Sequence, residues 1–386
     1  KILGPSIFSN DFLESTKEAS QYFISSQGEM INQIVPSVIF EKYKDIQNKK
    51  LKKKNGINEE FKLEKFIFQR DLEERVSFYK TLIRTEFAHG NSIFITFPTI
   101  ESLLFFYDEL SKGIERYVYV MHGEVSKKEI ISRYNKAVSE QHPVLILGTP
   151  SYVFIERPDL RTLIVEQEFS NAYYTQSRPY IDFRTFIEIL GTIRRQKIIF
   201  ADTVLRLETL YRYENKELLE LSPIKWRIES KASSYIIDSR EVGKDFKLIN
   251  EETKKEIEKS LERGGRVFIF TVRRGLHPTT VCSDCGTTIT CSRCSSPLVL
   301  HSTHGIERIF ICHKCKTERS ADTICKNCSG WKLTALGYGS ESVYEALKEI
   351  FKDRPIYILD KDSSKNTVSA KKIAKEFESK KSSILV

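Results

Sequence analysis

Short apolar runs alternate with amphipathic stretches along most of this chain. From about residue 62, runs rich in Ile, Val, Leu and Phe are followed by stretches whose apolar residues recur at helical spacing. Because strands that alternate with helices build parallel sheets, this region predicts an α/β domain. The predicted strands are Phe66–Phe68, Ile93–Phe97, Tyr117–Val120, Val144–Leu147, Leu163–Val165 and Ile198–Phe200, and the predicted helices include 100–112 and 125–138.

A second series of the same kind follows and is interrupted by a cysteine-rich segment. That segment enters after a predicted strand and leaves before a predicted helix, so we expect a second α/β domain that carries a small insertion. The predicted strands of this series are Tyr235–Ile237, Val267–Thr271, Ile356–Leu359 and Ile384–Val386, with helices near 341–351 and 370–378.

The N-terminal region has a different pattern. Apolar residues at helical spacing predict helix across 10–35, with Gly28-Glu29 before a second short amphipathic stretch that ends at Pro36. A small helical cap is one interpretation of this region. The lysine-rich run 49–54 ends in the turn residues Asn55-Gly56, and we predict a solvated linker there, with phosphate contact as the alternative.

Composition narrows the class of protein. The 386 residues are enough for two or three domains, and 40% hydrophobic with 29% charged residues is ordinary for a globular protein. No apolar run approaches the ~20 residues of a membrane span, so no membrane partner is predicted. The net charge of +9 suits a polyanion, although many basic proteins bind no nucleic acid. The first and last residues suggest an excerpt of a longer chain.

All eight cysteines lie between Cys282 and Cys328, in four C-x-x-C pairs. Two such pairs can close a tetrahedral site of four thiolates, which is the geometry that Zn²⁺ accepts. A disulfide framework would require a secreted protein, and a redox C-x-x-C would not occur four times in one segment. We therefore predict two structural zinc ions and a cytoplasmic location.

The spacing of the pairs favours a nested arrangement of ligands. Seventeen residues separate Cys294 from Cys312, whereas the five between Cys285 and Cys291 leave little room for two pairs to face each other. Because eight thiolates complete two sites, His301, His304 and His313 are not assigned as ligands. The predicted sites are Cys291, Cys294, Cys312 and Cys315 for one zinc, and Cys282, Cys285, Cys325 and Cys328 for the other.

The run Phe268–Gly275, followed by His277-Pro278, leads into the eight-cysteine segment at Cys282. This entry resembles that of the primosomal protein N′ (PriA) family of replication-restart DNA helicases, which carries an eight-cysteine insertion. Other similar segments span nearly the whole chain. They are Phe12–Pro36, Met121–Gly123, Gly148–Ser151, Leu163–Glu168, Gly337–Glu341 and Leu359–Asp362.

The resemblance implies a fold and a set of partners. It implies a winged-helix-like segment and Lys-rich linker at 1–60, a first RecA-like helicase lobe at 61–225 and a truncated second lobe at 226–386, with a double zinc subdomain at 282–328. It also implies the same nested zinc pairing. Forked or single-stranded DNA and primosome or replication proteins are the partners that it implies.

The phosphate loop of this superfamily is altered here. Such a loop needs glycines whose backbone N–H groups wrap the phosphates, a Lys on the phosphates and a hydroxyl on Mg²⁺. In an ungapped alignment the Lys becomes Arg75, the hydroxyl residue becomes Val76, and three acidic residues, Asp71, Glu73 and Glu74, would repel a triphosphate. The stretch from Gln69 to Ala88 lacks glycine and predicts a continuous helix.

The other motor motifs are altered as well. The family's Asp-Glu-Glu-His becomes Glu166-Gln167-Glu168-Phe169, and a Gln at the water-orienting position cannot act as a general base. Glu166 could hold Mg²⁺ or be a polar strand end. The Ser-Ala-Thr motif corresponds to Asp202-Thr203-Val204. These changes argue against ATP and Mg²⁺ as cofactors.

Cations near the cysteines are the predicted DNA contacts. Arg273 and Arg274 follow a strand, and Arg274 could instead brace the turn into the insertion. Phe310 and Trp331 could stack on bases, although packing around a small zinc core is the commoner use. The resemblance adds Thr149 and Ser151 at a strand end. Further candidates beside the cysteines, which could also be merely solvated, are Arg293, Lys314, Lys316 and Arg319.

Together these patterns lead to one main hypothesis and two alternatives. The hypothesis is a PriA-like protein with a defective ATPase that binds DNA or primosome partners in replication restart. One alternative is an active ATP-dependent 3′-5′ helicase that uses an altered phosphate loop. The other is a zinc-stabilised protein-interaction scaffold, for which DNA binding would be absent or insensitive to salt.

Overall fold

The computed structural model describes residues 7–46, 63–224, 232–237, 248–271, 279–303, 307–360 and 367–386. The chain divides into two compact units, Lys1–Lys231 and Ala232–Val386. The lysine-rich run and the predicted DNA contacts Arg273 and Arg274 lie outside the described residues.

A seven-stranded parallel sheet forms the centre of the first unit, in the order β3-β4-β2-β5-β6-β1-β7. The six strands predicted for this region are all present, and a short seventh strand is added at one edge. The strands are β1 (Glu64–Gln69), β2 (Ser92–Thr96), β3 (Val118–Met121), β4 (Leu145–Gly148), β5 (Leu160–Glu166), β6 (Lys197–Asp202) and β7 (Leu219–Glu220).

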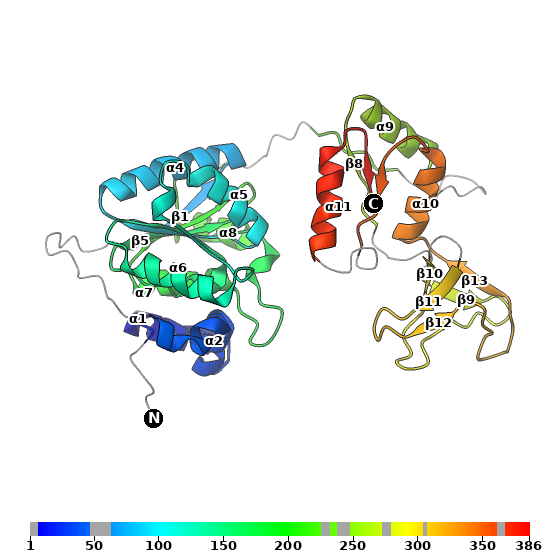
Figure 1. The fold of residues 1–386 in the computed structure, drawn as a ribbon, viewed down its shortest axis with the longest axis horizontal. Helices are drawn as coiled ribbons and strands as arrows, with labels where there is room; N and C mark the ends of the chain where they lie inside the picture. Colours follow the sequence, from blue (N-terminus) through cyan, green and yellow to red (C-terminus); the bar gives the residue numbers. More distant parts are fainter. Residues whose placement is uncertain are drawn as a thin grey trace. The chain divides into compact units, whose positions relative to one another are not determined.

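Helices cover both faces of this sheet, as Figure 1 shows. Successive strand residues point to opposite faces, so Ile93 and Ile95 join one core cluster while Phe94 joins the other. The first face is covered by α4 (Leu72–Ala88) and α5 (Ile100–Leu110), and the second by α6 (Lys127–Ser139) and α7 (Phe183–Ile193). Shorter elements connect them, namely α8 (Leu207–Glu214), η2 (Glu115–Tyr117), η3 (Pro150–Tyr152) and η4 (Asn171–Tyr173).

The N-terminal residues 7–46 are helical and contain no strand. A capping box between Ser26 and Glu29 starts a new helix, which is why the predicted helical region is divided in two. Phe12 packs edge-on against Phe186 of α7, with ring centroids 6.0 Å apart, so these helices share the core of the first unit. They are α1 (Asn10–Tyr22), α2 (Gln27–Ile34), α3 (Ser37–Glu41) and η1 (Tyr43–Asp45).

The second unit contains a three-stranded parallel sheet in the order β14-β15-β8, with helices that share its core. Residues 235–237, predicted as a strand, do not form one, and Ile236 is 100% exposed. The elements are β8 (Val267–Phe268), β14 (Ile356–Tyr357), β15 (Ile384–Leu385), α9 (Glu251–Glu262), α10 (Ser340–Ile350) and α11 (Thr367–Ser379).

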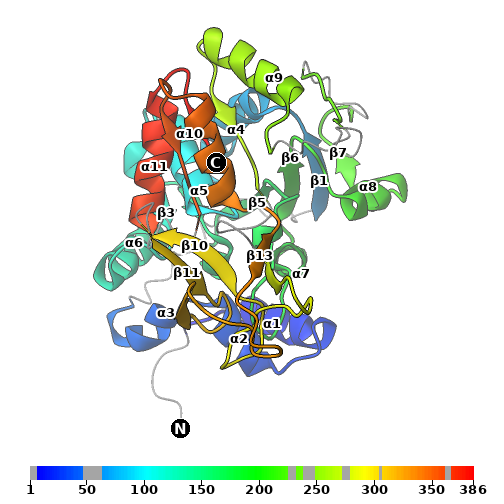
Figure 2. The ribbon, with the colours of Figure 1, turned by 90° about the vertical axis from the view of Figure 1, so that its right-hand side faces the viewer.

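The cysteine-rich insertion of the second unit, residues 279–336, is called the cysteine module below. Its first and last strands, β9 (Thr279–Cys282) and β13 (Leu333–Leu336), pair antiparallel and close it. Between them an antiparallel meander contains β10 (Val299–Thr303), β11 (Glu307–Ile311) and β12 (Glu318–Ser320). Figure 2 shows β10 and β11 side by side. Among the helices that the structure describes, none is long and apolar enough to cross a bilayer.

Candidate metal centres and the nucleotide position

The eight cysteines of the module gather into two groups of four. Within each group all four Sγ atoms lie within 4.8 Å of one another. Sulfur pairs across each group are 3.4–3.6 Å apart, close to the roughly 3.8 Å edge of a tetrahedron with Zn–S bonds of about 2.3 Å. The groups are Cys282, Cys285, Cys325 and Cys328, and Cys291, Cys294, Cys312 and Cys315, which is the predicted nested pairing.

The sulfur distances also decide against disulfide bonds. A disulfide requires about 2.05 Å between sulfurs, and all eight cysteines are free. Each group can therefore hold a metal ion.

One backbone turn is repeated at all four C-x-x-C pairs. The amide N–H of the first cysteine donates to the carbonyl five residues later, and its own carbonyl accepts from the N–H four residues later. The residue that makes this return bond has positive φ in every copy, which costs least at Gly286. The other copies place Ser295, Lys316 and Ser329 there. The sequence therefore encodes four matching turns that aim thiolates inward.

Hydroxyl groups beside two of the ligands favour the thiolate form that binds metal. The Sγ atom of Cys285 lies 3.3 Å from Thr287 Oγ1, and this hydrogen bond lowers the pKa of Cys285 to about 6. The same arrangement recurs at Cys315, where the hydrogen bond with Thr317 lowers the pKa to about 6. The thiols of Cys285 and Cys315 therefore lose their protons more readily than an ordinary cysteine thiol.

A chain of polar contacts ties the cysteine module to α10. The Nε2 atom of His301 lies 2.8 Å from Nε2 of His313, and its Nδ1 lies 2.7 Å from Glu341 Oε1. His301 is buried, and neither histidine belongs to the two sulfur groups. These contacts fix the module on α10 rather than supplying ligands, a role that sequence reasoning missed.

The predicted DNA contacts of the module lie in different surroundings. Arg293, Lys314 and Lys316 are exposed, whereas Arg319 is partly buried and donates to Thr323 Oγ1. Phe310 is buried in the module's core, so its side chain packs there rather than being open to a base. Trp331 is 74% exposed, with Lys332 Nζ 5.8 Å from the centre of its ring. The exposed ring and cations are chemically suited to nucleic acid.

Thr149 and Ser151 follow β4 at the carboxyl edge of the first sheet. The Thr149 N–H donates to the carbonyl of Met121, and the residues after it form η3. Both side chains are half-buried. Their position at a strand end agrees with the prediction, and their role stays a prediction.

The segment at the nucleotide position is a tight turn rather than a phosphate loop. β1 ends at Gln69 and α4 begins at Leu72, so two residues connect them. The N–H of Arg70 donates to the carbonyl of Asp202, 3.2 Å away, and is therefore occupied. Glu73 and Glu74 lie in the first helical turn, where their carboxylates complement the positive end of the helix dipole. The helix predicted over Gln69–Ala88 is confirmed from Leu72 onward, whereas Gln69 belongs to β1.

Arg75 and Glu166 form a buried ion pair beside this turn. Arg75 Nε and Nη2 lie 3.0 and 2.8 Å from Glu166 Oε1, and the two residues are 2% and 0% exposed. Arg75 Nη1 also donates to the carbonyl of Arg70 at 2.5 Å and to Thr203 Oγ1 at 2.7 Å. Tyr79 donates its hydroxyl proton to Glu166 Oε2. The two residues that align with the phosphate-binding Lys and the metal-binding Asp thus bind each other.

Burial governs the protonation of this cluster. It raises the pKa of Glu166 to about 7, against the opposing effects of the Arg75 charge and the Tyr79 hydrogen bond. Burial and the Glu166 charge together raise the pKa of Tyr79 well above its usual value, so this phenol stays a donor.

Gln167, aligned with the water-orienting residue, has a φ of 55° and accepts a hydrogen bond from Ser102 Oγ at 2.7 Å. Its amide cannot take a proton from water.

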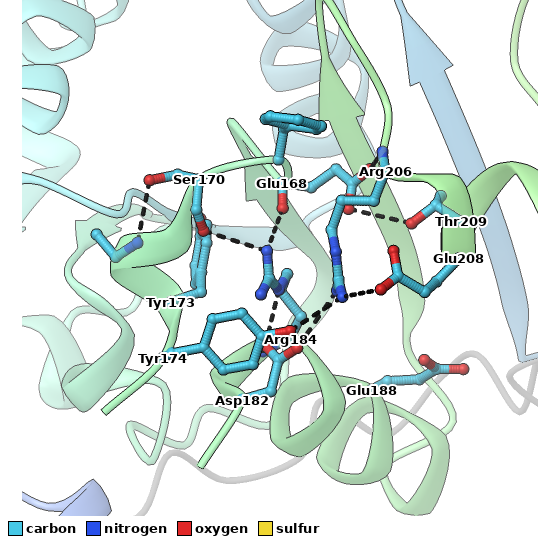
Figure 3. A network of polar contacts seen from close by, with 12 residues as sticks. Glu168, Ser170, Tyr173, Tyr174, Asp182, Arg184, Glu188, Arg206, Glu208 and Thr209 are labelled. Atoms are coloured by element: carbon cyan, nitrogen blue, oxygen red, sulfur yellow. Dashed lines mark hydrogen bonds and ion pairs between the residues drawn. The ribbon is translucent and has the colours of Figure 1, made fainter. Parts of the chain in front are cut away.

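Glu168 has a structural role that sequence reasoning missed. Figure 3 shows its side chain at the start of α8, where Oε1 accepts from the Arg206 N–H at 2.6 Å and Oε2 from Thr209 Oγ1 at 3.1 Å. Arg184 donates to the backbone carbonyl of Glu168 and, through Nε, to Asp182 Oδ1. The side chain and backbone of Glu168 are therefore committed to holding α7 and α8 near the end of β5.

Comparison with known proteins agrees with these motifs. No family model matches the chain. It is 30% identical over 320 residues to the replication restart protein PriA of Chlamydia trachomatis, which covers 80% of this chain and 41% of that protein. PriA of Rickettsia felis is 23% identical over 399 residues, 98% of this chain and 60% of its own length. The chain is similar to part of PriA.

The match to PriA has a limited extent. PriA of Haemophilus influenzae is 25% identical over 69% of this chain and 36% of its own length, so the chain spans about two fifths of several PriA relatives. Among solved structures, it is similar to the C-terminal domain of yeast Dbp5, at 15% identity and a TM-score of 0.31, over 41% of this chain and 89% of that one. The Mss116p DEAD-box domain 2 gives a TM-score of 0.31 at 9% identity, over 42% of this chain and 65% of that one.

Proposed function

We propose that this chain is a replication-restart protein of the PriA type that binds DNA and has a defective ATPase. The observation that carries the proposal is the buried pair of Arg75 and Glu166. It fills the place where a motor of this superfamily would hold phosphate and metal.

The chemistry of the pair opposes nucleotide binding. To contact a phosphate, Arg75 would have to leave Glu166 as a buried and uncompensated charge, which costs several kcal/mol. To bind Mg²⁺, Glu166 would have to give up Arg75 and Tyr79 together. The two-residue turn before α4 offers too few free N–H groups to wrap a triphosphate.

Each sulfur group would hold one zinc ion. Four thiolates with tetrahedral spacing suit Zn²⁺ better than a hard cation such as Mg²⁺ or Ca²⁺, which prefers oxygen. Structural zinc contributes on the order of 10–16 kcal/mol per site, enough to fold a module with a small apolar core. Free thiolates of this kind persist in a reducing compartment, so we propose a cytoplasmic location.

The cysteine module would supply the DNA contacts. Arg293, Lys314 and Lys316 present exposed cations, and Trp331 offers an exposed ring for base stacking. The PriA relatives are named as replication restart proteins, which favours forked or single-stranded DNA as the ligand and replication proteins as further partners.

Salt-dependent DNA binding tests the proposal. We expect the zinc-loaded chain to bind forked DNA and to lose affinity between about 50 and about 200 mM salt. The double variant Lys314→Glu/Lys316→Glu should bind more weakly, and its salt slope should fall by about 1 for each phosphate that the protein no longer neutralises. The control is Lys128→Glu, an exposed cation on α6 of the first unit, which should leave binding unchanged.

Two outcomes would contradict the proposal. Absent or salt-insensitive DNA binding would favour an interaction scaffold. DNA-stimulated ATP hydrolysis that Arg75→Ala abolishes would show a working helicase with an altered loop.

A further inference from the structure

A groove opens in the first unit, at the edge of the sheet opposite the Arg75–Glu166 pair. It lies between the C-terminal half of α4 and the end of α5, beside the residues that precede β3 and β4. Ile114, Tyr117 and His142 precede the parallel strands β3 and β4, so this is the amino edge of the sheet. Its volume of about 600 Å³ is in the range of binding sites for small molecules and peptide side chains.

The wall of the groove is aromatic. The rings of Tyr117 and His142 are stacked, with centroids 3.8 Å apart and planes 20° apart. Phe87 of α4 meets His142 edge-on at 5.6 Å. Leu110 and Ile114 add aliphatic surface to the lining. These elements place a continuous apolar surface where an aliphatic or aromatic side chain would be desolvated.

Cations outnumber anions around this surface. Three cations and one carboxylate line the groove, Lys80, Arg84, Lys112 and Glu109. The two lysines share the carboxylate of Glu109, with Nζ atoms 3.0 and 3.4 Å from its oxygens. Arg84 is exposed and makes no ion pair among the residues that the structure describes. The groove therefore combines an apolar wall with a net positive charge among its lining residues.

We propose that this groove binds an acidic peptide segment of a partner protein, with an aliphatic or aromatic side chain against Tyr117 and His142. Carboxylates of the peptide would meet Arg84 and Lys112, while its apolar side chain covers the aromatic wall. A nucleic-acid strand fits less well, because the aliphatic part of the wall, Leu110 and Ile114, offers no ring on which a base could stack. The site is independent of the proposed DNA-binding function.

Two variants and one control test the groove on the whole zinc-loaded chain. Arg84→Glu reverses the unpaired charge, and Ala88→Trp fills the groove from an exposed position at the end of α4. Lys128→Glu on α6 makes the same charge change on the other face of the unit. Neither groove variant removes a buried side chain, so all three should fold, and unchanged hydrogen-exchange protection of β2 and β5 in the first unit serves as the check.

The probe is a fluorescent peptide of about ten residues that alternates Glu with Leu and Phe. Matched peptides carry Lys in place of Glu, or Ser in place of Leu and Phe, and a single-stranded oligonucleotide is the competitor. We expect the acidic apolar peptide to bind, with affinity about tenfold weaker for Arg84→Glu and lost for Ala88→Trp. Lys128→Glu should bind like the unmodified chain.

Three results would overturn the inference. The first is failure of the acidic apolar peptide to bind. The second is binding of the peptide by both groove variants as tightly as by the unmodified chain. The third is displacement of the peptide by the oligonucleotide, if Arg84→Glu weakens oligonucleotide binding as much as peptide binding. The last result would make the groove a nucleic-acid site. Loss of peptide binding with DNA binding intact, or the reverse, separates this inference from the proposed function.

Discussion

Removing the guanidinium of Arg75 should destabilise the first unit strongly. In Arg75→Met the aliphatic stem is kept, but the carboxylate of Glu166 loses two N–H donors at 3.0 and 2.8 Å. The carbonyl of Arg70 and the hydroxyl of Thr203 lose a donor as well. Because Glu166 is 0% exposed, water cannot replace these contacts.

The size of the effect follows from burial. Breaking a buried ion pair by removing one partner costs about 3–5 kcal/mol, because the remaining charge is uncompensated. Replacing both partners by neutral groups is often close to neutral. Arg75→Met/Glu166→Gln should therefore recover most of the loss, since the Gln amide oxygen can still accept the proton of Tyr79.

Hydrogen exchange followed by mass spectrometry is the assay, at about pH 8, where Glu166 is ionised. Peptides from α4 and β5 report on the first unit by itself. The single variant should lose protection by a factor of at least about a hundred, and Lys128→Met, an exposed change on α6, should lose none. A single variant that loses less than about 1 kcal/mol, or a double variant as unstable as the single, would refute the reasoning.

Two further predictions concern the metal and the pH dependence. Cys291→Ser should reduce bound zinc from two ions to one per chain by native mass spectrometry, while Ser292→Ala in the same turn keeps both, and full occupancy in both variants would contradict the assignment. Because the pKa of Glu166 is raised to about 7, the proton it binds favours the folded state, so stability relative to Glu166→Gln should fall as pH rises from about 4.5 to about 7. The fall is at most on the order of 3 kcal/mol. The measurement is urea unfolding of both proteins across this pH range, and a difference in free energy of unfolding that does not change with pH would contradict the prediction.

Local patterns in the sequence predicted the parts of this fold that local physics decides. The spacing of the cysteines was enough to predict the nested pairing, because the five residues between Cys285 and Cys291 prevent two adjacent turns from facing each other. Lack of glycine from Gln69 to Ala88 predicted α4, and alternation predicted the strands of the first sheet. The run at 235–237 failed as a strand because apolar composition alone supplies no neighbouring strand.

Contacts between distant segments were beyond reach of the sequence. Arg75 and Tyr79 lie one helical turn apart on the same face of α4, which is a signal that they share a partner. That partner, Glu166, is supplied by a strand some ninety residues later, so only the assembled sheet brings it there. The same holds for Glu168 at the start of α8 and for the groove at the end of α4.

In the proposed function the Arg75–Glu166 pair takes the place of the nucleotide site. The most direct test is ATP binding by calorimetry, with single-turnover hydrolysis, on the purified zinc-loaded chain with and without forked DNA. We predict no heat of ATP binding and no hydrolysis, while DNA binds in the same preparation. Saturable ATP binding with hydrolysis that depends on Arg75 would contradict the account and make the chain a working helicase.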